Sequence, residues 1–411
     1  MVTPCSATSS RRSDQYFHVV YVDHLSLHEF RSWPSLDVEL GPGVTAFVGR
    51  NGQGKTNAVE GIDYLSRLSS HRVATDAPLV RQGASQAVVR AAVVRSDRRA
   101  VLEVEINPGR SNRARVNGSP LPRARDLIGT LRSVVFAPDD LVLVKGDPSE
   151  RRRFLDELLM QATPRYVGVK SDYDRVLKQR NSLLRTASNA RTSMQAAMST
   201  LEVWDERLVS LGAQIMVARQ DLSRELEPLL ARTYEAVART ARRTDAQIAY
   251  RPRLSEEVSG PLTESEYGEL LVAELERRRK DELVRGITLV GPHRDELACH
   301  LGDLPVKGYS SHGESWSFAL ALRLASYESL RGVDIGVVDD PVLILDDVFA
   351  ELDESRRDSL AELVADAEQV IVTAAVSDDV PSALRGRRLF VEDGIVSRET
   401  TDTTDTAEAA S

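Results

Sequence analysis

The sequence predicts an α/β fold that is interrupted by a long helical insertion. A short apolar segment at residues 44–48 runs into a glycine-rich loop and then into a segment of helical character. A second apolar segment, residues 342–345, ends in the paired acids Asp346 and Asp347. Between the two, residues 149–285 show helical rather than strand periodicity. Both ends of the chain are therefore expected to contribute to one mixed sheet.

The N-terminal part of the chain predicts strands with a single early helix. Residues 19–27 are rich in valine, tyrosine and leucine, and apolar residues alternate with polar ones over residues 36–40. A helix is expected from residue 55 to about residue 69. Asn117 and Gly118 tolerate positive φ and predict a tight hairpin, so an antiparallel subdomain is expected here. Its strands are predicted at residues 88–95, 101–106 and 113–116, and a separate strand at residues 133–137.

The central part of the chain carries a stripe of apolar residues at spacings of three and four. Leu201, Trp204 and Leu208 begin this stripe, which ends near Pro228. It fits either a coiled-coil seam or the core face of an ordinary helical subdomain. Because the segment is short, we favour a compact lobe or short arm. Strands are expected to return at residues 287–290, 342–345, 369–373 and 388–392.

The charge of the chain is uneven. The net charge of −9 alone argues against a nucleic-acid partner, because phosphates attract Lys and Arg. Residues 1–150 carry 19 Lys and Arg against 16 Asp and Glu, residues 151–285 carry 24 against 21, and residues 286–411 carry 10 against 25. The acidity belongs to the last third, so the net charge excludes nothing by itself.

Two cysteines, Cys5 and Cys299, cannot form a disulfide framework, which is typical of a reducing compartment. No apolar stretch approaches the ~18 residues that a membrane helix needs. We therefore expect a cytoplasmic protein without a membrane partner.

Residues 49–56 match the phosphate-binding pattern G-x-x-x-x-G-K-[ST]. Its glycines let the backbone N–H groups curl toward phosphate oxygens, while the lysine adds a positive charge and the threonine hydroxyl can ligate Mg²⁺. The alternative is a glycine-rich turn that binds nothing, but the strand before it and the helix after it favour the nucleotide site. The expected nucleotide-binding residues are Gly49, Arg50, Asn51, Gly52, Gln53, Gly54, Lys55 and Thr56.

The paired acids after the second apolar segment supply the carboxylates that a phosphate loop needs for its metal. They stand at the carboxyl end of a strand, where ligands bind in open α/β sheets. Thr56 and Asp346 are the expected Mg²⁺ residues. Asp347 is expected to orient or deprotonate the attacking water, with Lys55 as the second catalytic residue.

Further motifs resemble the ABC/SMC class of ATPases. About 290 residues separate Thr56 from Asp346, which suits an ATPase head with an insertion. Ser311, Gly313 and Glu314 precede an expected helix and resemble the class signature, with glutamate in place of glutamine. Asp353 follows the paired acids at the spacing of the D-loop.

Within that class the chain resembles the RecF family over residues 20–397. The resemblance is carried by the phosphate loop, the signature, Asp346 and Asp347, and by residues 30–32, 136–141, 146–148, 151–156, 178–181 and 291–295. It implies an ABC/SMC-type P-loop ATPase head with a mixed sheet, an antiparallel subdomain and an inserted helical lobe or short arm.

The resemblance also implies a function in DNA replication and repair. The family assists recombinase loading at gaps with RecO- and RecR-type proteins, binds double-stranded or gapped DNA, and dimerises on ATP. Ser311, Gly313 and Glu314 of one head would then meet the nucleotide of the other. Asp347 replaces the glutamate of transporter-type ABC proteins, and Ala374 stands at their switch-histidine position. We therefore expect slow ATP hydrolysis that acts as a switch.

The resemblance divides the chain into five parts. Residues 20–150 and 286–398 are expected to form the two halves of the ATPase head, and residues 151–285 the helical insertion. Residues 1–19 are expected to be a disordered extension or an upstream mis-start, with Val20 as the true initiator. Residues 399–411 are expected to be a disordered acidic tail.

A basic stretch follows the first half of the expected head. Residues 151–200 carry 10 Lys and Arg against 4 Asp and Glu. This stretch is either a DNA-binding face or a solvated helix face. The DNA-binding candidates are Arg151, Arg152, Arg153, Lys178 and Arg180. Arg31, Arg72 and His293 are further positions that could meet phosphate or DNA, or serve the fold alone.

Two other ATPase classes compete with this interpretation. A transporter motor subunit is disfavoured by the helical insertion and by Ala374 at the switch position. An SMC-type chromosome ATPase is disfavoured because its long arms need hundreds of residues. A scaffold with a decayed ATP site is disfavoured by Lys55, Thr56 and Asp346.

Overall fold

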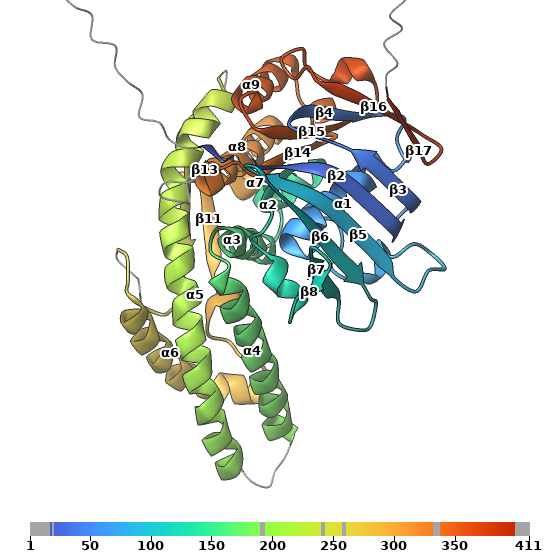
Figure 1. Cartoon of the computed structure of the whole chain (residues 1–411). Coiled ribbons are helices and arrows are strands. Elements are labelled where there is room, and N and C mark those ends of the chain that lie inside the picture. The colour runs from blue at the N-terminus through green and yellow to red at the C-terminus, as the bar shows by residue number, and fades with distance from the viewer. Residues whose placement is uncertain are drawn as a thin grey trace, which may run out of the picture.

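The chain forms a head of two packed sheets from which a helical arm projects (Figure 1). The computed structural model describes residues 17–18, 20–189, 194–239, 243–256, 260–331 and 338–398. The predicted fold class, an α/β head with an inserted arm, is confirmed. Within the described part of the chain, no helix has the length and apolar character needed to cross a membrane.

The sheet that carries the predicted phosphate loop is mostly parallel. Val342, Leu343, Ile344 and Leu345 are fully buried, because both faces of the sheet are covered. Their side chains alternate between two hydrophobic clusters, one on each face. The sheet has the spatial order β17 (Ile395–Arg398), β16 (Arg387–Glu392), β4 (Gly43–Val48), β15 (Gln369–Ala374), β14 (Val342–Asp346) and β9 (Ser133–Phe136), with only β17 antiparallel.

The second sheet is antiparallel, as predicted. Helix α1 (Lys55–Arg67) lies between the two sheets, and its Val59 and Ile62 are fully buried there. Asn117 and Gly118 take φ values of 52° and 79° in the predicted tight turn. The spatial order is β3 (Trp33–Glu39), β2 (Val20–Phe30), β5 (Ala87–Arg95), β6 (Arg98–Ile106), β7 (Arg113–Val116) and β8 (Ser119–Pro120).

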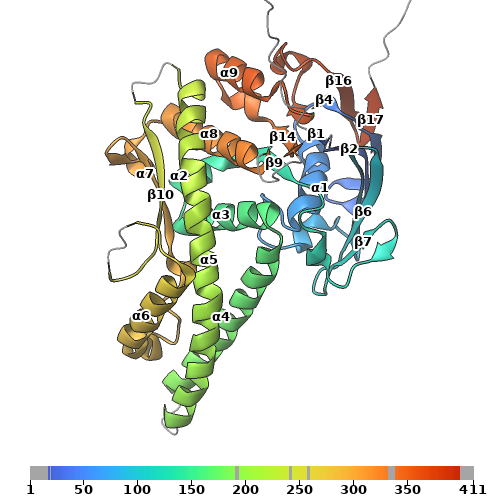
Figure 2. The ribbon, with the colours of Figure 1, turned by 60° about the vertical axis from the view of Figure 1, so that its left-hand side comes forward.

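Helices cover the other face of the parallel sheet. Helix α8 (His312–Arg331) lies between this sheet and the long helix α5 (Met194–Val237), as Figure 2 shows. Trp316 and Phe318 of α8 are buried in this cluster. The layer is completed by α2 (Leu141–Lys145), α3 (Pro148–Ala162) and α9 (Glu354–Val364).

The arm is formed by α4 (Arg165–Asn189), the first part of α5, and α6 (Glu264–Arg285). The predicted apolar stripe is the core face of this lobe, since Leu208 and Ile215 are buried against α4 and α6. The stripe does not end near Pro228 as predicted. Helix α5 continues to Val237, and the packing of Leu230 and Tyr234 against the head offsets the hydrogen bond that proline removes.

Two local predictions are wrong: the backbone N–H groups of Thr288 and Leu289 bond to the side chains of Asn181 and Glu282 and not to a strand, and a distant strand pair was missed. Residues 287–290 form no strand, and β10 (Ala246–Arg251) lies inside the segment predicted to be helical. β10 pairs with β11 (Glu296–Leu301), which also pairs with β12 (Leu304–Pro305). The partners are about 50 residues apart in sequence, so local periodicity does not reveal the pairing.

The ends of the chain lie mostly outside the described residues. Phe17–His18, within the segment expected to be disordered, form β1 in parallel with β13 (Val338–Asp339). The other residues predicted as an extension or mis-start, and the predicted acidic tail from residue 399, lie outside the described residues. A short helix, α7 (Val306–Tyr309), precedes α8.

A buried ion cluster holds the arm together and provides a stability test. Arg180 is fully buried and donates to Asp205 and Glu282 at 2.6 Å each and to Thr288 at 2.9 Å. Arg180→Met is expected to lower the free energy of unfolding by about 3–5 kcal/mol, because Glu282 remains fully buried without its cation, while Asp205 keeps its pair with Arg279. Denaturant unfolding measures this loss. Lys178→Met, an exposed position on the same helix, is the control. Equal stabilities of the two variants would contradict the prediction.

Candidate nucleotide site and its surroundings

The loop at residues 49–54 joins the end of β4 to the start of α1, as its motif requires. Gly54 has φ of 97°, in the left-handed region that favours glycine. A Cβ on Gly49 would lie 2.2 Å from the backbone oxygen of Val391 in β16. The loop is therefore confined by a neighbouring strand and by its own turn.

Lys55 is folded back over this loop. Its Nζ donates to the carbonyl oxygens of Gly49 at 2.5 Å and Arg50 at 3.0 Å, and the residue is buried. Burial lowers the pKa of Lys55, while the negative charges of Asp347 and Asp346 act in the opposite direction. The ammonium group is thus positioned inside the loop, on the side of the two acids.

The two predicted metal residues meet although they are 290 residues apart. Thr56 Oγ1 donates to Asp346 Oδ1 at 2.9 Å, and Thr373 Oγ1 donates to the same oxygen at 2.7 Å. Burial raises the pKa of Asp346, and these hydroxyl bonds oppose the increase. A hydroxyl and a carboxylate are the hard oxygen ligands that Mg²⁺ takes beside phosphates and water, so the residues fit this ion.

Asp347 is held in an uncommon backbone conformation at the end of β14. Its φ is 53°, and its N–H donates to Thr373 Oγ1 at 2.9 Å. The residue is partly exposed, whereas Asp346 is buried. Sequence reasoning missed Thr373. The signal was a polar residue directly before Ala374, at the end of the apolar run that follows Gln369.

The strand β3 supplies a second residue that sequence reasoning missed. Trp33 is buried and its Nε1 donates to the Gly54 carbonyl at 3.0 Å. A Cβ on Gly54 would lie 3.0 Å from that nitrogen, so glycine and tryptophan fit each other. Arg31 and Arg72, possible phosphate contacts, both pair with the buried Glu60 instead. Through Trp33, the antiparallel sheet therefore contacts the last residue of the loop, directly before the start of α1.

The predicted signature residues cap the start of α8. The Ser311 N–H donates to Glu314 Oε2 at 2.8 Å, and the Glu314 N–H donates to Ser311 Oγ at 3.2 Å. Glu314 also pairs with Arg243 at 2.9 Å. The Ser311 N–H is the first cause of a lowered pKa of Glu314. Among described residues, no hydrogen bond or ion pair joins residues 311–314 to residues 49–56.

Asp353, the predicted D-loop residue, is the N-cap of α9. It accepts from the Arg356 N–H at 2.9 Å and pairs with the same guanidinium. Arg356 also donates to Ser317 at 2.9 Å and would lie 2.9 Å from a Cβ on Gly313. One arginine therefore connects the D-loop with the signature helix.

Two of the five DNA-binding candidates are not available for DNA. Arg151 is buried and bonded to both oxygens of Glu296, at 2.8 and 3.0 Å. Arg180 is fully buried in the arm. Both predictions are wrong because counting charges along a helix does not show which side faces inward. Arg152 and Arg153 are partly exposed, and Lys178 is exposed.

His293 belongs to the junction between head and arm. Its Nδ1 lies 2.7 Å from the Tyr173 hydroxyl, and its Nε2 lies 3.2 Å from the Thr288 carbonyl. Burial lowers the pKa of His293 to about 4, so the ring is neutral at physiological pH. These contacts support a structural role of His293 in the fold.

Comparison with known proteins identifies the family. The sequence model of the RecF/RecN/SMC N-terminal domain matches residues 21–397. A DNA replication and repair protein RecF from Nocardioides sp. (strain ATCC BAA-499 / JS614) is 57% identical over 92% of this chain and 100% of its own length. The chain belongs to the RecF family. RecF of Streptomyces avermitilis is 55% identical, with the same coverage of both chains.

Solved structures agree with this membership. A structure described as the recombination mediator RecF with ATP in the RecFOR pathway is 27% identical, with a TM-score of 0.84 over 94% of this chain and 100% of that chain. An Smc head domain from Pyrococcus furiosus is 15% identical, with a TM-score of 0.51, covering 92% of this chain and 95% of that chain, and shows the fold alone. The RecF interpretation is thus supported over the transporter and chromosome-ATPase alternatives.

The close approach of β16 to the loop provides a test of the site. Gly49→Ala is expected to weaken binding of a fluorescent ATP analogue by about tenfold or more, because the new Cβ must displace the loop from Val391. Gly168→Ala, whose Cβ would meet nothing within 4 Å, is the control. Unchanged ATP affinity in the Gly49 variant would show that the loop adapts freely.

Proposed function

We propose that this chain is an ATP-gated DNA-binding protein of replication and repair, in which ATP joins two heads and hydrolysis separates them. The observation that carries the proposal is the contact of Thr56 with Asp346 across 290 residues. This contact assembles one half of an ATP site from the two parts of the head. The RecF relatives are replication and repair proteins, and a RecF of known structure binds ATP.

Each residue of the half-site has a separate task toward ATP. The loop N–H groups and Lys55 bind the phosphates, and Thr56 and Asp346 hold Mg²⁺. Mg²⁺ neutralises charge on the phosphate oxygens when it is bound. Asp347, partly exposed beside Thr373, orients the attacking water. Its short side chain and the presence of Ala374 leave that water loosely held, so hydrolysis is slow.

The second half of the site comes from another copy of the chain. Ser311 and Gly313 lie at the start of α8 and have no described contact with the phosphate loop of their own head. In a dimer they cover the γ-phosphate of the partner, with Asp353 at the same interface. ATP then becomes part of the interface and stabilises the dimer by mass action.

Membership of the RecF family supports a proposal for the DNA and protein partners. The exposed Lys178 and the partly exposed Arg152 and Arg153 contribute phosphate contacts to double-stranded or gapped DNA. RecO- and RecR-type proteins act with the dimer in recombinase loading at gaps, in line with the RecFOR description of the solved relatives.

Dimerisation tests the proposal directly. Size-exclusion chromatography with light scattering, with and without ATP and gapped duplex DNA, is expected to show an ATP-dependent dimer of the wild type. Lys55→Ala is expected to lose ATP binding and the dimer together. Ser311→Arg is expected to bind ATP normally and remain a monomer, because only the trans contact is blocked. Dimerisation of Ser311→Arg at wild-type level would overturn the trans contact.

Glu314 allows a second test of the same interface. Its carboxylate lies at the helix start that meets the partner's γ-phosphate, and Arg243 only partly neutralises it. Glu314→Gln keeps the capping geometry and removes a repulsive charge, so ATP-dependent dimerisation is expected to tighten about threefold to tenfold. Glu328→Gln removes the same kind of ion pair, with Arg232, from the same helix. Equal effects of both variants would count against a role of Glu314 at the phosphate.

A further inference from the structure

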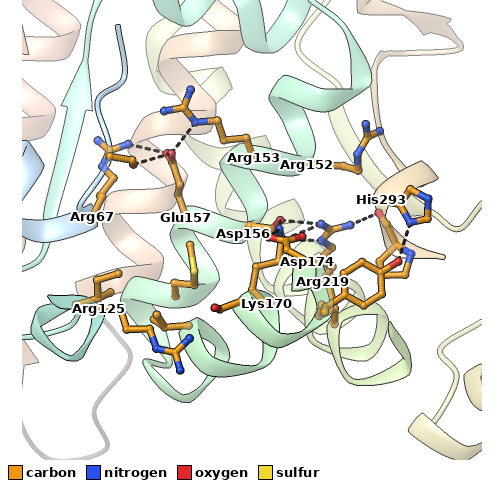
Figure 3. Close-up of a pocket in the computed structure, with 18 of the residues that line it drawn as sticks. Arg67, Arg125, Arg152, Arg153, Asp156, Glu157, Lys170, Asp174, Arg219 and His293 are labelled. Carbon is orange, nitrogen blue, oxygen red and sulfur yellow. Dashed lines mark hydrogen bonds and ion pairs between the residues drawn. The ribbon is translucent and has the colours of Figure 1, made fainter. Parts of the chain in front are cut away.

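A cavity of about 660 Å³ lies where the arm meets the head (Figure 3). It is bordered by the end of α1, the turn after β8, α3, α4 and α5. The described residues that line it include six cationic side chains and three carboxylates. The cations are Arg67, Arg125, Arg152, Arg153, Lys170 and Arg219, and the carboxylates are Asp156, Glu157 and Asp174.

The carboxylates of this cavity are already engaged. Both oxygens of Asp156 accept from Arg219, at 2.8 and 2.9 Å, and Glu157 is shared by Arg67 and Arg153. Asp63, behind the cavity wall, adds a further partner for Arg67. Asp174 pairs with Lys170 at 2.5 Å.

Two cations in this cavity have no acidic partner in the described part of the chain. Arg152 donates to the Asp295 carbonyl at 2.7 Å and forms no ion pair there. Arg125 forms neither an ion pair nor a side-chain hydrogen bond with any described residue. Burial lowers the pKa of Arg152 and the positive charge of Arg219 lowers it further, while the negative charges of Glu296, Asp295 and Asp156 act in the opposite direction.

A second cavity, of about 970 Å³, shares Arg125 with the first. It lies beside the antiparallel sheet and reaches Arg175 on α4. Its lining has one carboxylate, Glu105, which lies 3.6 Å from Arg113 and 3.7 Å from Arg115. Asp172, outside the lining, pairs with Arg175. Its cations are Arg110, Arg113, Arg115, Arg123, Arg125 and Arg175.

We propose that the two cavities form one groove, between the antiparallel sheet and the arm, that binds the phosphate backbone of duplex DNA. This inference rests on the proposed DNA-binding function and gives it a location. The chain as a whole has a net charge of −9, yet cations without ion pairs gather in this one concave region. Their charges produce a positive electrostatic potential there, which attracts phosphate groups. Arg110, Arg123, Arg125 and Arg152 form no ion pair with any described carboxylate.

The lining favours duplex backbone over single-stranded bases. Tyr173 and His293 are the aromatic rings among the described lining residues of both cavities, and they are bonded to each other. Single-strand binding requires free aromatic faces on which bases stack. A groove lined by arginines without free aromatic rings is suited to bind the phosphate groups of a DNA backbone.

The groove is tested by removing charges that the fold does not use. The triple variant Arg110→Gln, Arg123→Gln, Arg125→Gln removes three cations without acidic partners among the described residues. The control triple Arg98→Gln, Arg207→Gln, Arg251→Gln removes three exposed cations that line neither cavity. Both triples change the net charge equally. Fluorescence anisotropy of labelled duplex DNA with ATP, over a series of salt concentrations, is the measurement.

The groove triple is expected to weaken duplex binding by about tenfold or more and to reduce the salt slope by about 2–3, because each phosphate contact contributes about 0.9 to that slope. The control triple is expected to change affinity by less than about twofold. ATP-dependent dimerisation of both triples should match wild type.

Equal weakening by the two triples, or an unchanged salt slope in the groove triple, would overturn the groove while leaving DNA binding intact. A wild type that binds no duplex with ATP would overturn the proposed function itself. A groove triple that loses binding to a single strand but not to duplex would overturn the choice of duplex DNA as the occupant.

Discussion

The head depends on one buried carboxylate oxygen that accepts two hydroxyl hydrogen bonds. Asp346 Oδ1 accepts hydrogen bonds from the hydroxyl groups of Thr56 in α1 and Thr373 in β15, and Asp346 is the last residue of β14. Three segments distant in sequence thereby meet at one atom. Because burial disfavours the charged form of this carboxyl, the two bonds are needed to hold it. The position of the phosphate loop relative to the sheet follows from this contact.

Helix α3 connects the head with the arm through a set of hydrogen bonds and ion pairs. Arg151 binds Glu296 of β11, Arg152 binds the backbone before that strand, and Arg153 binds the backbone of Ser70 beyond α1. On its other side, Asp156 holds Arg219 of α5. Rotation of the arm against the head would have to break several of these bonds together. The three consecutive arginines at residues 151–153, which resemble a DNA-binding face in the sequence, therefore mainly hold neighbouring segments of the fold together.

Most of the head could be predicted from sequence because its signals are local. Apolar runs bounded by glycine or acid mark β4 and β14, and the hairpin residues mark the antiparallel subdomain. The failures involve distant partners. β10 becomes a strand only through β11, and α5 passes Pro228 only because the head packs against its final turns. Trp33 supports the loop through a fold contact that no motif records.

By itself, the sequence determined which residue types the proposed nucleotide site contains, since the spacing of Gly49, Lys55 and Thr56 and the pair of acids are local patterns typical of phosphate and metal binding. Only the tertiary structure decided which cations are free. Whether an arginine can bind DNA depends on the carboxylates that folding places beside it, and these come from other parts of the chain. Packing therefore engages Arg151 and Arg180 internally, and leaves Arg125 without an ion pair within the described residues, in the lining of two cavities near the arm.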